Sequence, residues 1–457
     1  MTRSLWVDEL EQTESIEIGK SMLALIQEMY PIGRSITGPG LRATIARLSR
    51  IVPLQVTEVP SGTRVFDWTV PDEWSVEEAF IESPDGRRIV DINTSNLHLV
   101  GYSVPVEAEM TLSELRPHLH SLPEYPDWIP YRTSYYSRSW GFCLADRVLK
   151  SLREGRYRVV IRSRLEPGSL TFAEYVHPGA TRDEVLIFAH SCHPSLANDN
   201  LSGLAVAINL AAFLRGRDTR FTYRFVFAPA TIGSLAWLAS NERSLHRIRH
   251  GLVLSLLGDS GPIHYKETRA GNHPIDRIAW HVLSTEFPGS RKIDFLPWGY
   301  DERQYNSPGI DLAVGRITRT PNGEFPEYHT SADNPEFLSA EALAESWLAC
   351  LKVLEALDCD AHYRNLQPKG EPQLGRRGLY RTTGGHQDVP ERQLALLWVL
   401  NQSDGSRSLC DIAERSRLPF RVIFNAAADL ARAGLLAPAD GAAAQSGDGG
   451  NPGSSGA

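Results

Sequence analysis

The sequence predicts an α/β protein: a mostly parallel sheet with helices on both faces, joined by a small inserted β-domain and a helical C-terminal unit. Between residues 156 and 317, short apolar strands alternate with amphipathic helices, which is typical of buried parallel strands. Residues 52–110 instead contain short β-type runs separated by Pro, Gly and Asp-Gly. Residues 386–437 contain three short helical segments.

The N-terminal part begins with two predicted helices. Apolar residues recur at helical spacing within ESIEIGKSMLALIQEMY, and the turn PIGRSITGPG leads into LRATIARLSRIV. The β-type runs then predict an inserted β-domain over 55–110, so that 1–54 and 111–365 form the main domain. Helical signals return at Thr111, a predicted N-cap with Glu114 at capping-box spacing.

The main domain is predicted from the order of its later segments. The expected strands are YRVVIRS, EVLIFA, TYRFVFAP, LVLSLLG and IDLAVGRI. The expected helices between them are LSGLAVAINLAAFL, SLAWLASNE and IDRIAWHVLSTEF. Because apolar strands alternate with helices, we expect both faces of the sheet to be covered.

The C-terminal part begins with a Gly-, Pro- and Arg-rich stretch that predicts a linker over 366–385. The helices of 386–437 predict a winged-helix-like domain, and the Gly/Ala/Ser-rich tail 438–457 is expected to be disordered. Six arginines and six acids make 386–437 electrically neutral. We therefore favour protein contacts or homo-oligomerisation over nucleic-acid binding, which needs a basic face.

The bulk composition agrees with an ordinary globular protein. The chain has 457 residues and a net charge of −8, which disfavours general binding to nucleic acid or anionic lipid. No segment approaches the apolar length of a membrane span, and the expected location is cytoplasmic. Five scattered cysteines predict neither a disulfide framework nor a thiolate metal site. Cys192 could be a nucleophile beside His193, but a buried, inert thiol is the favoured reading.

Two polar clusters carry the chemistry. The first follows the apolar strand EVLIFA and contains His190, His193 and Asp199; the second, EYHTSADN, contains His329 and Asp333. Open α/β sheets place ligand sites at the carboxyl ends of their strands. Catalytic zinc sites use three N or O ligands and keep one open position, so His193, Asp199 and His329 would supply the set. For His190 we favour a supporting or structural role, and the plain alternative is that these polar residues are satisfied within loops.

Beyond these clusters, a series of ordered motifs resembles a known family. The stretches are PIGRSITGPGLR, VPSGTRVFDWTVPDEW, PYRTSYYSRSWGFC, CHPSLANDNLSG, YDERQYNSPGIDL and FPEYHTSADN. Together they resemble the bacterial aminopeptidase-like domain found with polysaccharide and secondary-metabolite biosynthesis, a relative of the co-catalytic zinc aminopeptidases. The resemblance implies a zinc-aminopeptidase-like fold with an inserted β-domain and a C-terminal winged-helix unit.

The resemblance also implies roles for individual residues. His193 matches the first zinc histidine, Asp199 the aspartate that bridges two metals, and His329 the last histidine ligand. Asp259 falls where the relatives carry a further carboxylate ligand.

The stretch GYDERQY matches one that lines the substrate pocket in relatives. Asp301 and Glu302 are therefore the catalytic candidates, expected to engage the substrate amine, although a salt bridge is an equal alternative for Glu302. Arg303 and Tyr328 are the candidates for substrate binding, since a guanidinium suits bidentate recognition of a carboxylate. Arg34 could act in the same way, with a structural ion pair as the alternative.

One departure from the family pattern concerns the general base. Relatives carry a Pro-Glu-Thr-Ile-Gly-Ser turn whose glutamate fits that role, whereas this chain has Ala230 in the glutamate position. A methyl group cannot accept a proton, and positioned general-base catalysis contributes roughly 10²- to 10⁴-fold. Zinc alone still lowers the pKa of bound water to ~7.

The expected function is zinc-dependent hydrolysis of an amide in a small peptide or aminoacylated metabolite of a biosynthetic pathway. Ala230 motivates an alternative, a catalytically impaired binding or scaffolding protein. A third alternative is a transcriptional regulator that binds DNA through residues 386–437.

Overall fold

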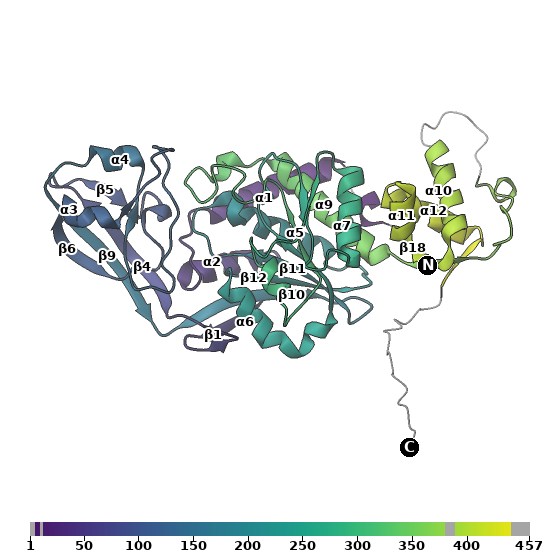
Figure 1. Ribbon diagram of the computed structural model, residues 1–457, viewed down its shortest axis with the longest axis horizontal. Helices are drawn as coiled ribbons and strands as arrows, with labels where there is room; N and C mark the ends of the chain where they lie inside the picture. The colour runs from purple at the N-terminus through teal and green to yellow at the C-terminus, as the bar shows by residue number, and fades with distance from the viewer. Residues whose placement is uncertain (1–4, 10–11, 380–388, 440–457) are drawn as a thin grey trace, which may run out of the picture. The chain divides into compact units, whose positions relative to one another are not determined.

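The computed structural model describes residues 5–9, 12–379 and 389–439. These residues divide into two units (Figure 1). The larger unit runs from Trp6 to Asp358, and the smaller one combines Leu5 with the chain from Cys359 onward. Residues 380–385 of the predicted linker and 440–457 of the predicted tail lie outside the described residues.

The larger unit is built around an eight-stranded sheet in the order β1-β10-β12-β11-β13-β16-β14-β15. In that order the strands are Gln55–Pro60, Ser169–His177, Thr222–Ala228, Glu184–His190, Ile248–Leu254, Val314–Thr318, His264–Lys266 and Arg291–Ile293. All seven residues of β11, the strand that leads to the first polar cluster, are buried.

The sheet is mixed. Its central strands β12, β11, β13 and β16 are parallel, as the alternation of strands and helices predicted. On one side β1, β10 and β12 pair antiparallel, and on the other β14 pairs antiparallel with β16. The carboxyl ends of the parallel strands therefore share one edge, where β11 delivers His190.

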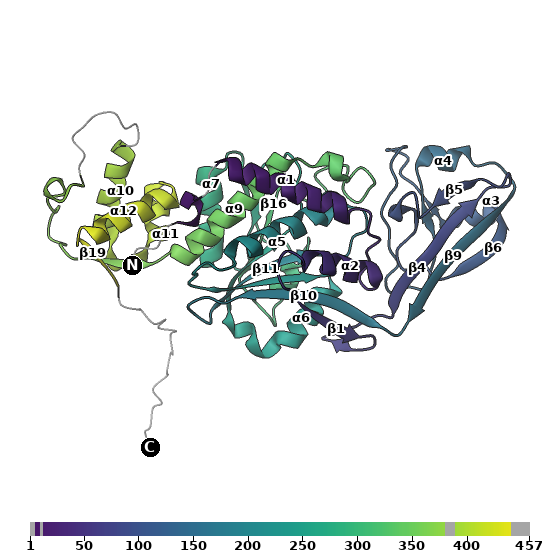
Figure 2. The ribbon, with the colours of Figure 1, turned by 180° about the vertical axis from the view of Figure 1, so that it is seen from behind.

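Helices cover both faces of this sheet, with α1, α5 and α9 in front in Figure 2 and α6 and α7 in front in Figure 1. The helices of this unit are α1 (Gln12–Met29), α2 (Pro39–Leu48), α3 (Leu112–Leu115), α4 (Asp146–Ser151), α5 (Gly203–Leu214), α6 (Ile232–Asn241), α7 (Pro274–Glu286), α8 (Glu302–Tyr305) and α9 (Ala340–Cys359). Helix α5 is almost wholly buried because it lies between the sheet and α1, which explains its apolar sequence. A Cβ at Gly19 of α1 would lie 2.1 Å from the Ala340 carbonyl oxygen, so the glycine allows α1 to approach α9.

A second, four-stranded sheet has the order β5-β4-β9-β6 and uses residues beyond the range 55–110. Its strands are Arg88–Asp91, Glu73–Glu82, Arg156–Glu166 and Val106–Thr111. The segment YRVVIRS was expected in the large sheet, but it lies in β9 of this one. Its arginines alternate with buried residues, which is the pattern of an antiparallel strand with one solvated face. The predicted Thr111–Glu114 capping box is confirmed at α3.

Shorter elements complete the larger unit. The strands are β2 (Arg64–Val65), β3 (Trp68–Thr69), β7 (Leu119–His120) and β8 (Phe142–Cys143). The 3₁₀ and π-helical segments are η1 (Trp6–Glu9), η2 (Asn96–His98), η3 (Arg116–His118), η4 (Ala197–Ser202), η5 (Glu242–Arg247) and η6 (Pro335–Phe337).

The smaller unit has the three predicted helices and a three-stranded sheet, β18-β17-β19. Its elements are β17 (His362–Asn365), η7 (Gly375–Arg377), α10 (Val389–Gln402), β18 (Asp404–Ser408), α11 (Leu409–Ser416), α12 (Phe420–Arg432) and β19 (Leu436–Pro438). Ser408 caps α11 in a capping box with Asp411. Buried apolar residues of α11 and α12 form its core, among them Ile412, Ile423 and Leu430.

Among the described residues, no helix is both long and apolar enough to cross a membrane.

Candidate metal centre

The first two histidines of the site are delivered by strand β11. His190 is its last residue and is 1% exposed, and His193 follows in the adjoining loop. Nε2 of His190 lies 3.1 Å from Nδ1 of His193. The backbone oxygen of His193 accepts a hydrogen bond from Nε of Arg34 at 2.9 Å, which fixes the loop from the other side. Two imidazoles are therefore held face to edge at the end of a buried strand.

Asp199 comes from η4, directly before helix α5. Both Asp199 and Asn200 leave helical geometry there, and the peptide bond between them is cis. The side-chain oxygen of Asn200 accepts from the backbone N–H of Leu256 at 3.2 Å, which ties the turn to the chain after β13. A Cβ at Gly203 would lie 2.4 Å from that same oxygen, so a glycine is required where α5 begins.

His329 reaches the same place from a loop far along the chain. Its Nε2 lies 2.9 Å from Oδ2 of Asp199, and its φ of 58° is uncommon for a residue with a side chain. The ring of Tyr131 meets the rings of His193 and His329 edge-on, with 5.1 Å between centroids in each case. Tyr328 stacks on His329 at 4.0 Å. Aromatic rings thus restrict the directions in which both imidazoles can turn.

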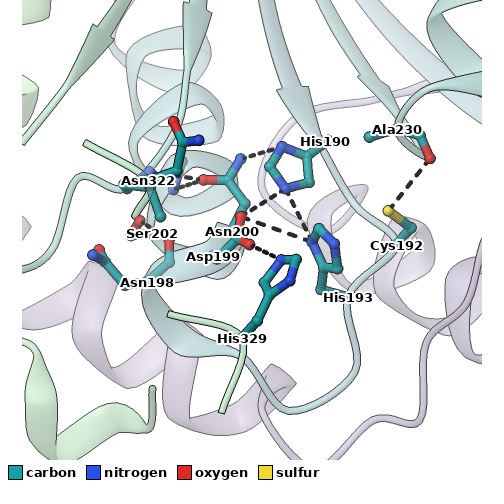
Figure 3. Close-up of polar contacts among 12 residues, drawn as sticks. His190, Cys192, His193, Asn198, Asp199, Asn200, Ser202, Ala230, Asn322 and His329 are labelled. Atoms are coloured by element: carbon teal, nitrogen blue, oxygen red, sulfur yellow. Dashed lines mark hydrogen bonds and ion pairs between the residues drawn. The ribbon is translucent and has the colours of Figure 1, made fainter. Parts of the chain in front are cut away.

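The donor atoms converge on Asp199, as Figure 3 shows. Its Oδ1 lies 3.0 Å from Nε2 of His190 and 3.8 Å from Nδ1 of His193, while Oδ2 faces His329. The donor atoms of His190, His193 and Asp199 all lie within 4.8 Å of one another, close enough to hold one metal ion. Imidazole nitrogen and carboxylate oxygen are donors that zinc accepts, so the residues present fit that ion.

The electrostatics of the cluster suit a cation. Burial raises the pKa of Asp199, but the surrounding histidines outweigh it and hold the pKa well below its usual range. Burial lowers the pKa of His193 to about 3, against the opposing effect of Asp199. At neutral pH the cluster therefore contains an ionised carboxylate beside a neutral imidazole of His193, the forms that bind metal.

Asp333 supports the turn that carries Asp199. Its two carboxyl oxygens accept hydrogen bonds from the backbone N–H groups of Asn198 at 2.5 Å and Asp199 at 3.0 Å. Burial raises the pKa of Asp333 to about 8, and the charge of Asp199 adds to this effect. The side chain is 0% exposed and holds the backbone of η4 in place.

Asp259, the further predicted ligand, has other partners. Its Oδ2 accepts from the side chain of Asn198 at 3.0 Å, and its Oδ1 accepts from the Thr320 hydroxyl at 2.6 Å and the Gly261 N–H at 2.8 Å. It does not belong to the cluster formed by the two histidines of the β11 end and Asp199.

The two predicted catalytic carboxyls differ from each other. Asp301 is 1% exposed, and its Oδ1 accepts from the Ser234 hydroxyl at 2.6 Å, while its Oδ2 has no hydrogen-bond partner among the described residues. Burial raises its pKa to about 6. Glu302 instead forms a buried ion pair with Lys266 at 2.8 Å, and Arg316 lies 3.6 Å away. The salt-bridge alternative for Glu302 is the one observed.

Ala230 lies near this centre. The thiol of Cys192, the residue before His193, is 3.8 Å from the Ala230 carbonyl oxygen (Figure 3). Burial raises the pKa of Cys192 to about 12, which agrees with an inert thiol. Arg303 lies 3.5 Å from the Thr231 hydroxyl, so it borders the same segment.

His190, for which the sequence favours a supporting or structural role, lies within the cluster itself. The sequence carried one signal, since His190 and His193 both follow the buried strand three residues apart. The direction of each side chain at a strand end depends on the loop that follows. Asn200 shapes this arrangement, because its amide nitrogen lies 3.3 Å from Nδ1 of His190.

Comparisons with known proteins agree with the geometry. Residues 23–360 match the family described as a domain of unknown function (DUF4910), and residues 361–438 match the winged helix-turn-helix family. A protein of Clostridium acetobutylicum, provisionally named a polysaccharide biosynthesis protein with aminopeptidase-like domain, is 47% identical over 422 residues. The match covers 92% of this chain and 97% of the relative.

Solved structures show the same fold. A crystal structure of a protein from Clostridium acetobutylicum, provisionally called a peptidase, has a TM-score of 0.89 and 45% identity over 93% of this chain and 98% of that chain. BSAP, a zinc aminopeptidase from Bacillus subtilis, has a TM-score of 0.53 and 13% identity over 74% of this chain and 94% of that chain. The resemblance to an aminopeptidase-like fold is thereby confirmed.

Proposed function

This chain belongs to the DUF4910 family and carries a winged helix-turn-helix domain after it, and from its cluster of histidines and Asp199 we propose that it is a zinc-dependent amide hydrolase of aminopeptidase type. Its substrate would be a small peptide or an aminoacylated metabolite of a biosynthetic pathway. The relative named for polysaccharide biosynthesis and the solved relative called a peptidase support this assignment.

The observation that carries the proposal is the convergence of four donor side chains. His190, His193 and His329 all approach the carboxylate of Asp199, within 3.0, 3.8 and 2.9 Å. A buried ion pair needs only one partner for its carboxylate, so the presence of three histidines around Asp199 favours a metal site over a structural ion pair. Bound zinc would polarise a carbonyl group and lower the pKa of water to ~7.

The protein's own residues would prepare this chemistry. Asp199 supplies the negative charge, and the rings of Tyr131 and Tyr328 hold the imidazoles of His193 and His329 in their orientations. Asp301 offers a buried carboxyl oxygen without a partner among the described residues, which suits contact with a substrate amine.

A direct test uses purified protein stripped with a chelator and then reloaded with zinc. Aminoacyl p-nitroanilides should be hydrolysed by the reloaded protein, and the stripped protein should be inactive. If zinc does not bind and no turnover occurs at high protein concentration, the proposal fails.

Ala230 favours a second candidate function, an aminopeptidase-like binding or scaffolding protein that keeps the metal. Zinc binding with no turnover of any aminoacyl compound would support this candidate. Substantial turnover by the native chain would refute it.

For the winged-helix unit we propose a role in contacts with protein, such as homo-oligomerisation. Two of its arginines, Arg392 and Arg432, share the carboxylate of Asp429, which offsets one of their two positive charges. Sedimentation of the full chain with and without residues 361–457 would test this role. Retardation of DNA by the full chain at moderate salt would contradict it.

A further inference from the structure

A cavity of about 470 Å³ lies beside the segment that carries Ala230. Thr231 contributes to its wall, as does Arg303 of α8. Apolar walls come from Phe295, Pro297 and Trp68, the last supplied by strand β3. The cavity therefore combines two cationic side chains, Arg269 and Arg303, with apolar surface beside the segment that follows Ala230.

Arg303 differs from the other cations of this region. Lys266 and Arg316 share Glu302, and Arg269, which also lines the cavity, lies 3.3 Å from Asp311. Arg303 forms no ion pair with any carboxylate within the described ranges, and its nearest polar contact is the Thr231 hydroxyl at 3.5 Å.

The guanidinium of Arg303 also keeps an unused donor. Its Nε is buried and has no hydrogen-bond partner among the described residues. A guanidinium presents its N–H groups as a planar fork that matches a carboxylate in bidentate fashion. A buried donor without an acceptor is costly, so a ligand that supplies one would be bound favourably.

Aromatic side chains lie at and near the cavity. Trp68, which lines it, is 41% exposed, and Trp298, outside the lining, is 68% exposed, with its ring centroid 6.0 Å from the guanidinium of Arg303. The ring of Trp68 also packs edge-on against the exposed ring of Tyr136, with 5.2 Å between the ring centroids. Exposed aromatic side chains around a hollow mark a surface that binds apolar groups.

We propose that this cavity is a substrate subsite in which Arg303 binds a carboxylate and the lining side chains Trp68 and Phe295 contact an adjacent apolar group. The substrate class is accordingly an amide that also carries a free carboxylate, such as a peptide with its C-terminus unblocked. The link to catalysis rests on the proposed function, whereas binding at Arg303 does not.

One short segment of the chain links the cavity to the loop of the metal centre. Thr231 is shared by the cavity wall and by the segment that begins at Ala230. The Ala230 carbonyl contacts Cys192, which precedes His193. The segment of Ala230 and Thr231 therefore connects the cavity wall with the loop that carries His193.

The test is calorimetric titration of the full chain, stripped of metal, with hippurate and with hippuramide. These probes share a benzoylglycyl body, but only hippurate has a carboxylate. We expect hippurate to bind at least about tenfold more tightly than hippuramide, because a charge-assisted fork is lost in the amide. Equal affinity for both probes, or no hippurate binding at millimolar concentration, would overturn the proposal.

Variants assign the effect to Arg303. R303Q should weaken the binding of hippurate by about tenfold or more and leave the binding of hippuramide unchanged. The affinity of R303K for hippurate should lie between those of R303Q and the native chain, because lysine keeps the charge without the planar fork of N–H groups. W68A should weaken the binding of both probes to the same extent. R249Q, which removes an exposed arginine paired with Asp183, is the matched control and should change neither. Unchanged hippurate binding in folded R303Q and R303K would refute the proposal.

The same variants separate this inference from the proposed hydrolase function. If hippurate binding depends on Arg303 but no aminoacyl compound is hydrolysed, the subsite stands and the hydrolase assignment fails. If nitroanilides are hydrolysed and R303Q binds hippurate normally, the subsite fails and the hydrolase assignment stands.

Discussion

Oδ2 of Asp199 lies 2.9 Å from Nε2 of His329, although 130 residues separate the two in the chain. The other oxygen, Oδ1, lies 3.0 Å from Nε2 of His190. A single buried carboxylate thus joins the end of the central strand β11 to a loop that follows β16. Any change that moves the backbone of Asp199 should disturb both halves of the centre together.

Asp333→Asn is therefore expected to destabilise the chain and weaken metal binding. Asparagine keeps one carbonyl oxygen but brings an NH₂ group, whose hydrogens would meet one of the two backbone N–H groups that now donate to Asp333. The cost should be about 1–3 kcal/mol of unfolding free energy, measured by urea denaturation.

The control for this change is Asp127→Asn, which removes an exposed carboxylate paired with Arg147. It should alter stability by less than about 0.5 kcal/mol. Equal stability of both variants would show that Asp333 does not hold the turn.

Ala230→Glu is expected to increase hydrolysis. A carboxylate in this position could accept a proton from water, and a positioned general base contributes roughly 10²- to 10⁴-fold. The measurement is kcat/KM for an aminoacyl p-nitroanilide with zinc-loaded protein.

Ala230→Gln is the matched control, because glutamine has nearly the same size but cannot accept the proton. An equal increase in both variants would point to altered packing, and no increase in Ala230→Glu would contradict a missing base.

The buried pair of Lys266 and Glu302 should contribute to stability as a unit. Nζ of Lys266 also donates to the carbonyl oxygens of Leu296 and Trp298, so the ammonium group has three hydrogen-bond acceptors. Glu302→Gln leaves that cation without its counter-charge and should cost about 3–5 kcal/mol in unfolding free energy.

Replacing Lys266 by Met and Glu302 by Leu should cost less than the sum of the two single changes, because neither charge of the pair is then left without the other, although the buried Arg316 still loses Glu302. A double variant as unstable as the sum of the two single variants would contradict this account. Urea denaturation of the three variants decides between the outcomes.

Sequence patterns predicted the alternating part of the fold because buried parallel strands produce unbroken apolar runs, such as EVLIFA in β11. They misplaced β9, since its apolar residues were read as one run although its arginines mark one solvated face. Strand β10 was not predicted, because the segment SLTFAEYVH mixes polar and apolar residues without a clear period.

The candidate site was predictable in part. Motif order led to His193, Asp199 and His329, which the fold brings together. The partners of Asp259 and Glu302 could not be read from the sequence, because Thr320 and Lys266 reach them only through the folding of distant strands. From the sequence, a carboxylate that binds a ligand cannot be distinguished from one that pairs with another side chain of the protein.

The stability of the smaller unit should depend on pH through Asp360. Burial raises the pKa of Asp360 to about 6 from 3.8, although its carboxyl accepts a hydrogen bond from the Cys410 N–H at 2.9 Å. The folded chain therefore holds this proton more tightly than the unfolded chain. The stabilisation is present below pH ~4 and is lost as the pH rises through ~6.

Asp360→Asn should accordingly be more stable than the native chain above pH ~6 by an amount on the order of 1 kcal/mol, and this advantage should shrink toward pH ~4. The measurement is the difference in unfolding free energy between the two proteins across this range. A difference that does not change with pH would refute the role of Asp360.

The most direct test of the central claim is anomalous diffraction at the zinc edge from crystals of this protein soaked with zinc. The account predicts a strong peak within ~2.0–2.2 Å of the Asp199 carboxylate and of imidazole nitrogens from the histidine cluster. Absence of a peak at Asp199, with zinc bound only at other places on the surface, would contradict it.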